Sequence, residues 1–253
     1  KMIIIFILSI IQGITEFLPI SSSSHLILVS NYLQNDSQDL SIDVSLHIGS
    51  FLAVIFYFKK DIFSFVQNKT LFLKIFISCI PIMITGYILV KYNLIEQLRN
   101  LKVIGWTTLL FGILLYFSDK SKNFKNIKNN FDYKSALYIG LFQILSLIPG
   151  VSRSGISITT ARFLKFERFN SAKISFLLSI PTLAAVSFFG ITNLLISDNL
   201  QFTLFNILSI SLSFIFSLIT IIFFLKFIKK FSLNIFVTYR VILGAIILYF
   251  AYL

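Results

Sequence analysis

Polar and ionisable residues interrupt an apolar stretch near the start of the chain, which reads QGITEFLPISSSSH over residues 12–25. Glu16 has apolar neighbours on both sides, and a carboxylate in such surroundings is costly and usually functional. Gln12 precedes it by four residues, so both side chains share one face of a helix. Because hard divalent cations prefer oxygen ligands, we predict that Gln12 and Glu16 bind Mg²⁺ or Ca²⁺. The alternatives are a structural ion pair for Glu16 and an interhelical hydrogen bond for Gln12.

The second part of this segment carries hydroxyl groups and a histidine. Pro19 breaks the helix, and the four serines that follow supply capping hydroxyls and free backbone N–H groups, a setting suited to anions. Ser22 and His25 are three residues apart and share a helix face, where imidazole can accept a hydroxyl proton. We predict that Ser22 and His25 are catalytic together with Glu16, and that Ser21 and Ser23 bind substrate phosphate. Helix capping and a hydrogen bond between helices are the alternatives.

A second interruption, PGVSRSG at residues 149–155, repeats this arrangement with an arginine in place of the carboxylate. The guanidinium of Arg153 can form forked, charge-assisted hydrogen bonds to phosphate oxygens. We therefore predict a catalytic role for Arg153. The predicted diphosphate-binding set of this break is Ser152, Arg153, Ser154 and Gly155, since glycine lets a ligand approach the backbone. The alternative is an arginine that snorkels from a helix end.

Three further polar residues within apolar stretches receive a structural interpretation. His47 lies at the start of an apolar stretch and is interpreted as a hydrogen-bonded structural histidine. Arg162 and Arg240 lie near the ends of apolar stretches, where we expect their side chains to snorkel toward the membrane surface.

The composition indicates the class of protein that must position these residues. Hydrophobic residues make up 57% of the 253 residues and charged residues 13%, and the mean hydropathy is +0.89. Soluble domains usually carry about 25% charged residues. We predict an all-α polytopic membrane protein that forms a single integral membrane domain over residues 1–253. The net charge of +12 does not indicate nucleic-acid binding, because the basic residues lie in short segments between apolar stretches.

Six apolar stretches are long enough, or nearly so, to cross a hydrocarbon core of roughly 30 Å. They lie at about 44–58, 71–90, 103–118, 174–196, 203–228 and 235–253. Two more stretches, 3–33 and 135–164, are each broken by proline and a turn rich in serine or glycine. Each half is too short to cross alone, so we predict two re-entrant helical hairpins.

The basic residues also predict an orientation, because loops rich in Lys and Arg lie in the cytoplasm. Four segments have this composition: 59–74, 118–134, 162–173 and 226–230. These four segments lie on the same side of the membrane only if the first broken stretch enters it from outside and the second from inside. The chain then contains an inverted-topology repeat, approximately residues 1–118 and 135–253, with its site near the membrane midplane.

These residues together favour phosphoryl transfer, in which catalysis is mostly positioning and charge neutralisation. A phosphate site among membrane crossings suits a head group on a lipid tail that enters from the side. The competing class is a lipid-phosphate flippase, because inverted repeats with broken helices are also transporter architecture. We expect membrane lipids to surround the protein. The question whether it forms a homodimer stays open.

The chain resembles the bacterial undecaprenyl-pyrophosphate phosphatase (BacA/UppP) family in five segments: QGITEFLPISSSSH, SLHIGSFLAV, PGVSRSG, FLLSIPTLAA and FVTYRVILG. The resemblance implies hydrolysis of undecaprenyl diphosphate to undecaprenyl phosphate and inorganic phosphate. This reaction recycles the lipid carrier for peptidoglycan and other cell-wall polymers and is associated with bacitracin resistance. The resemblance also implies a divalent cation and a plasma-membrane site that opens to the outer face.

Residue roles follow from the same resemblance. The family's motifs fall on Gln12 and Glu16, Ser22, His25, and the phosphate-binding run Ser152, Arg153 and Ser154. Many members carry glutamate at the position of Gln12, so this chain has one charge fewer beside the cation. Attack by Ser22 with His25 as its base and direct attack by His25 both remain open.

Overall fold

The computed structural model describes residues 2–32, 40–67, 69–92, 94–121, 124–196 and 203–253. Within these ranges the chain is helical, and the described part contains one isolated β-bridge, between Lys125 and Phe166, but no strand. The predicted all-α class is therefore confirmed.

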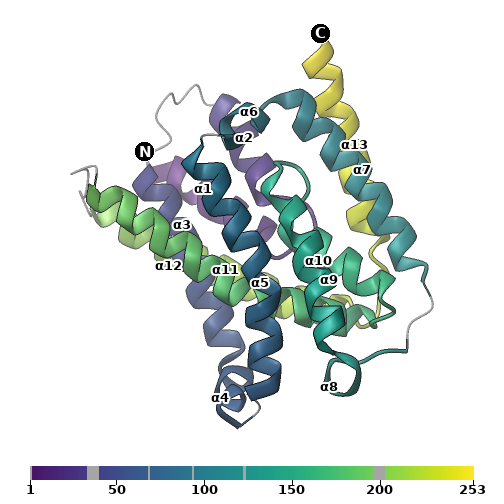
Figure 1. The fold of residues 1–253 in the computed structure, drawn as a ribbon. Coiled ribbons are helices and arrows are strands. Elements are labelled where there is room, and N and C mark those ends of the chain that lie inside the picture. Colours follow the sequence, from purple (N-terminus) through teal and green to yellow (C-terminus); the bar gives the residue numbers. More distant parts are fainter. Residues whose placement is uncertain (1, 33–39, 68, 93, 122–123, 197–202) are drawn as a thin grey trace.

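The helices follow one another from purple to yellow in Figure 1. The first half contains α1 (Met2–Thr15), α2 (Ser22–Tyr32), α3 (Leu40–Tyr57), α4 (Lys59–Gln67), α5 (Lys69–Lys91), α6 (Leu94–Leu98) and α7 (Leu101–Asp119). The second half contains α8 (Ile127–Asn130), α9 (Tyr133–Gln143), the 3-10 helix η1 (Ile144–Leu147), α10 (Arg153–Phe163), α11 (Arg168–Ile196), α12 (Leu204–Phe227) and α13 (Asn234–Tyr252).

Five of the described helices are long and apolar enough to cross a membrane, namely α5, α7, α11, α12 and α13. They coincide with five of the six predicted crossings. The remaining crossing, predicted at 44–58, lies in α3, whose described part is apolar but shorter. The chain is thus a polytopic membrane protein, and the number of six crossings stays a prediction.

Both broken stretches fold as a helix, a break and a second helix. In the first, α1 ends at Thr15 and α2 begins at Ser22. In the second, α9 continues into η1, and α10 begins at Arg153 after a turn. Residue 33, at the end of the first predicted stretch, lies outside the described residues. The re-entrant insertion of the two units remains a prediction.

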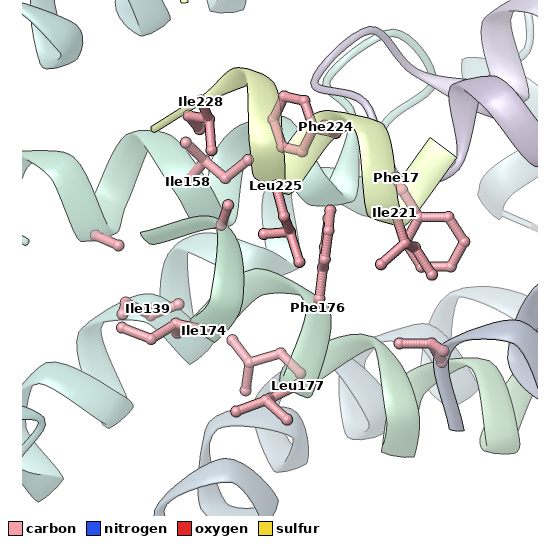
Figure 2. Packing of buried hydrophobic residues seen from close by; sticks show 14 of the residues in the cluster. Phe17, Ile139, Ile158, Ile174, Phe176, Leu177, Ile221, Phe224, Leu225 and Ile228 are labelled. Carbon is pink, nitrogen blue, oxygen red and sulfur yellow. The ribbon is translucent and has the colours of Figure 1, made fainter. Parts of the chain in front are cut away.

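The hydrophobic core anchors the first break directly beside its carboxylate. Phe17, which follows Glu16, is fully buried, and its ring lies edge-on to Phe176 of α11 at a centroid distance of 5.3 Å. Figure 2 shows Phe17 next to Ile221 of α12, with Phe224 and Leu225 of the same helix nearby. The break is therefore held by close packing, and Glu16 is held with it.

The pairing of helices has the exchange pattern expected of two related halves. Helix α1 packs on α12, whereas α9 packs on α5, and α3 and α7 pack on α11 and α13 respectively. Gly13 lets α1 approach the backbone of α12, and Gly140 lets α9 approach that of α5, since an added Cβ would clash at both positions. This packing is compatible with the predicted inverted repeat, which stays a prediction.

Candidate active site

The two breaks meet at an ion pair. Arg153 Nη2 donates a hydrogen bond to Glu16 Oε1 at 2.9 Å, and the two side chains are only 13% and 6% exposed. Arg153 Nη1 also donates to the Ser175 carbonyl oxygen of α11 at 3.3 Å. The carboxylate of the first break and the guanidinium of the second are therefore in direct contact, as expected if the two interruptions form one site.

The other carboxylate oxygen of Glu16 collects the predicted partners of the first break. Glu16 Oε2 accepts hydrogen bonds from Ser22 Oγ at 2.9 Å and from Gln12 Nε2 at 3.2 Å. Gln12 Nε2 also lies 3.1 Å from His47 Nδ1. His47, which we had interpreted only as a structural residue, is therefore a neighbour of this group.

His25 is held at both ring nitrogens. Its Nδ1 lies 2.7 Å from the Ser21 carbonyl oxygen, and its Nε2 lies 2.6 Å from the Tyr239 hydroxyl. Among the described residues, the Ser22 hydroxyl has Glu16 and not His25 as its hydrogen-bond partner. Ser22 and His25 thus lie on one helix as their spacing predicted, but they do not hydrogen-bond to each other among the described contacts.

The turns before α2 and α10 share an uncommon backbone conformation. Ser21 and Ser152 immediately precede these helices and have φ of 74° and 73°, a region that residues other than glycine seldom occupy. Ser21 Oγ lies 3.3 Å from Ser23 Oγ, and Ser152 Oγ lies 3.1 Å from Ser154 Oγ. Ser152 also caps α10 by accepting a hydrogen bond from the Gly155 N–H at 3.1 Å. Each break therefore places serine hydroxyls at a helix N-terminus, where an anion is stabilised.

A buried arginine joins the two breaks, and our snorkelling interpretation of Arg240 is wrong. Arg240 is fully buried and makes its hydrogen bonds to backbone carbonyls. The acceptors are Thr108 at 3.1 Å, Pro19 at 3.2 Å, Val151 at 3.0 Å and Gly150 at 2.9 Å. These acceptors lie in α7, the first break and the second break, so one side chain fixes all three relative to one another.

The snorkelling interpretation is also wrong for Arg162. Its side chain is fully buried, with Nη2 lying 3.2 Å from the Asp119 carboxylate and donating to the Asp119 carbonyl at 2.7 Å. Arg168 binds the same carboxylate through two hydrogen bonds, of 2.7 and 2.9 Å. An acidic partner inside the protein therefore keeps Arg162 from reaching the surface.

Two hydroxyl groups give the breaks further support. Ser154 Oγ, predicted to bind phosphate, donates to the Leu18 carbonyl oxygen at 2.7 Å and is almost completely buried. Thr107 Oγ1 of α7 donates to the Pro149 carbonyl oxygen at 2.6 Å. In this structure the Ser154 hydroxyl connects the two breaks, while Ser152 lies at the start of α10.

The oxygen atoms beside Glu16 fit a cation that is held largely by its substrate. Gln12 Oε1 is buried and has no hydrogen-bond partner in the described part of the chain. No cluster of three or more His, Cys, Asp or Glu side chains among the described residues could hold a metal ion. Mg²⁺ is commonly bound by one or two carboxylates together with substrate phosphates. One amide oxygen and one carboxylate match that mode better than an all-protein cage.

The structure adds three residues that we did not assign to the site: His47, Tyr239 and Arg240. Arg240 carried a detectable signal, because it lies well inside an apolar helix, and an arginine there is expensive unless it is bonded. Tyr239 gave no comparable signal, since tyrosines are frequent near membrane surfaces.

Comparisons with known proteins identify the family of this chain. The family model described as "Bacitracin resistance protein BacA" matches residues 5–246. A protein of Pelagibacter ubique named undecaprenyl-diphosphatase is 51% identical over 249 residues, covering 98% of this chain and 97% of that protein. Proteins of the same name from Roseobacter denitrificans and Jannaschia sp. are 40% and 38% identical, and each match covers 98% of both chains. Because the family model spans nearly the whole chain and these relatives align almost end to end, the chain belongs to the BacA family.

Proposed function

We propose that this protein hydrolyses undecaprenyl diphosphate to undecaprenyl phosphate and inorganic phosphate. The reaction recycles the lipid carrier for peptidoglycan and other cell-wall polymers in the bacterial plasma membrane. The observation that carries the proposal is the contact between Glu16 and Arg153, which places a carboxylate and a guanidinium between two helix N-termini in an apolar protein. The relatives' activity agrees with what such a site can do.

The diphosphate is bound by positive groups from both breaks. Arg153 makes forked hydrogen bonds to its oxygens, and the N-termini of α2 and α10 add free N–H groups and the positive ends of the helix dipoles. Ser21, Ser23, Ser152 and Gly155 line these helix starts. The isoprenoid tail remains among the apolar helices, so the head group enters the site from within the membrane.

Glu16 and the amide oxygen of Gln12 would hold a divalent cation, Mg²⁺ or Ca²⁺, which would neutralise phosphate charge. In the structure Glu16 and Arg153 neutralise each other. In the complex the guanidinium of Arg153 would bind phosphate, and the carboxylate of Glu16 would face the cation. Each charge thus stays compensated through the exchange, as a buried ion pair requires.

In the first chemical step, Ser22 Oγ attacks the terminal phosphorus. The new O–P bond forms as the bond to the bridging oxygen breaks, and undecaprenyl phosphate leaves. In the structure the Ser22 hydroxyl donates to Glu16, and the Tyr239 hydroxyl contacts His25 Nε2. Substrate binding moves the Ser22 hydroxyl to His25, which accepts its proton.

In the second step, water breaks the phosphoserine bond and releases inorganic phosphate, and the proton returns from His25 to Ser22. The pocket opens to the outer face of the plasma membrane, in keeping with the predicted orientation of the basic loops.

Purified protein in detergent tests the activity, because a detergent micelle has no two sides between which a flippase could transport. We expect phosphate release from a C15 or C55 isoprenyl diphosphate with Mg²⁺ or Ca²⁺ present. Failure to release phosphate from either substrate, in protein shown to be folded, would refute the phosphatase and leave the flippase as the better reading.

A further inference from the structure

Tyr239 of α13 reaches the candidate active site from 214 residues beyond His25 in the chain. Its hydroxyl oxygen lies 2.6 Å from His25 Nε2. The two rings are also stacked, with centroids 5.8 Å apart and planes 9° from parallel. The tyrosine therefore contacts both the edge and the face of the imidazole, which restricts the ring's rotation.

The two hydrogen bonds of His25 determine which nitrogen carries the proton of the neutral ring. The Ser21 carbonyl oxygen, 2.7 Å from Nδ1, can only accept a hydrogen bond, so Nδ1 must donate. The neutral ring then has its lone pair on Nε2, and the Tyr239 hydroxyl donates to that lone pair. Without Tyr239, the Ser21 carbonyl would be the single hydrogen-bond partner of the ring among those the described structure shows.

Helix α13 presents this hydroxyl from a fixed position. Arg240, the next residue, is fully buried and bonded to the carbonyls of Pro19 and Val151. Pro19 lies two residues before Ser21, the residue that holds the other side of the imidazole. The donor at Nε2 and the acceptor at Nδ1 are therefore positioned by the same buried arginine.

We propose that Tyr239 is a positioning residue for the hydrolysis: it holds the Nε2 edge of His25 in place, while the Ser21 carbonyl keeps the proton on Nδ1. The proposal rests on the role of His25 as the base. Because Nε2 has a single lone pair, the tyrosine hydroxyl releases it when the Ser22 hydroxyl delivers its proton there. The step needs no co-reactant, since the proton stays on His25 until it returns to Ser22.

The variant Tyr239→Phe removes one oxygen and keeps the stacked ring. We expect its kcat for phosphate release from an isoprenyl diphosphate to fall about tenfold or more, as is typical of a misoriented catalytic group. Its KM should stay within about twofold of the wild-type value, because the phosphate-binding groups are unchanged. The matched control is Tyr249→Phe in the same helix. The Tyr249 side chain is exposed and lies roughly 15 Å further along the helix axis than Tyr239, so its loss of a hydroxyl should leave kcat unaltered.

The second readout is the hydrogen bond at His25 Nε2, which a tyrosine that only fills space would not make. The chain contains two histidines, so ¹⁵N-histidine labelling gives a simple NMR spectrum, and the signal lost in His25→Gln identifies His25. We expect the Nδ1–H tautomer in both proteins, with an Nε2 signal that shifts in Tyr239→Phe because its hydrogen bond is lost. The wild-type spectrum tests the tautomer even where the variant does not fold.

A mixture of tautomers in the wild type would overturn the proposal, as would an unchanged kcat or an unchanged Nε2 signal in folded Tyr239→Phe. These outcomes differ from a failure of the proposed function. An inactive wild-type protein would refute the phosphatase itself, whereas an active wild type with a fully active Tyr239→Phe variant refutes only the role of the tyrosine.

Discussion

Arg153 Nη2 and Glu16 Oε1 lie 2.9 Å apart although 137 residues separate them in the chain. Each residue sits at a helix break, and each break is fixed by buried contacts of its own. Phe17 packs into the core beside Glu16, and Ser175 accepts a second hydrogen bond from Arg153. The pair therefore depends on the whole fold. Under the proposed function, Glu16 is the group that would contact a cation and Arg153 the group that would contact a diphosphate.

The first prediction concerns the cation. Gln12→Glu should lower the Mg²⁺ concentration required for half-maximal phosphate release, because it adds a second carboxylate beside Glu16. Gln12→Ala should raise that concentration, because it removes the unpartnered amide oxygen. Titration of chelator-treated protein with Mg²⁺ measures both. Gln143→Ala, which removes the amide of the second break, serves as control, and an equal shift in that variant would argue against a cation at Gln12.

The second prediction concerns the arginine that joins the breaks. Arg240→Met leaves four backbone carbonyls without their donor, so the free energy of unfolding should fall by about 3 kcal/mol or more. Arg240→Lys keeps the charge but offers a single ammonium group. Its free energy of unfolding should therefore lie between those of the wild type and Arg240→Met. Thermal unfolding in detergent measures the change. The exposed Arg99, replaced by Met, is the control, and equal stability of the Arg240 and Arg99 variants would contradict the joining role.

The third prediction concerns pH and a helix cap distant from the site. Asp132 caps α9 by accepting a hydrogen bond from the Ser135 N–H at 2.8 Å. Hydrogen bonds from Ser135 lower the pKa of the exposed Asp132 carboxyl below its usual value. A lowered pKa in the folded state means that the ionised carboxylate stabilises the fold at neutral pH. This stabilisation is lost as the pH falls through the folded-state pKa.

Asp132→Ala should therefore lower the free energy of unfolding by about 1 kcal/mol at neutral pH. The difference from the wild type should shrink in acid, when the wild-type carboxyl is protonated. Thermal unfolding at a series of pH values follows this difference, and phosphate release should be unchanged in the folded variant. A difference in the free energy of unfolding that grows toward acid pH would contradict a lowered pKa of Asp132 in the folded state.

The fourth prediction separates the two nucleophiles. Labelled isoprenyl diphosphate, quenched during turnover, should leave acid-stable phosphate on the protein, as expected of phosphoserine. Ser22→Ala should abolish this label, whereas Ser211→Ala, at an exposed serine of α12, should retain it. Acid-labile phosphate that persists in Ser22→Ala and disappears in His25→Gln would identify histidine as the nucleophile instead.

The main features of the site follow from the sequence because they are costly in hydrocarbon. A carboxylate at Glu16 and a guanidinium at Arg153 stand out in apolar stretches, and the loop charges predict that their breaks enter from opposite sides. Proline and serine at each break give the positions of the helix starts. These local signals were sufficient to predict that the two charged residues share a site.

The remaining features depend on partners that no local signal identifies. The spacing of Ser22 and His25 predicted a direct pair, but Glu16 binds the hydroxyl and Tyr239 binds the imidazole. Arg240 was expected to snorkel because it lies near the end of an apolar stretch, and its backbone-carbonyl acceptors cannot be identified from the sequence. The turns that orient those carbonyls form only after distant helices have packed together.

The most direct test of a shared site is phosphate release by Glu16→Gln, Arg153→Gln and the double variant in detergent, measured as kcat/KM. Each single change should reduce kcat/KM about 100-fold or more, and the double variant should be little worse than either, because residues that act as a unit are not additive. Tyr249→Phe, measured alongside, should keep the wild-type value. Wild-type kcat/KM in either folded single variant, or losses that simply multiply in the double variant, would contradict a site built jointly by the two breaks.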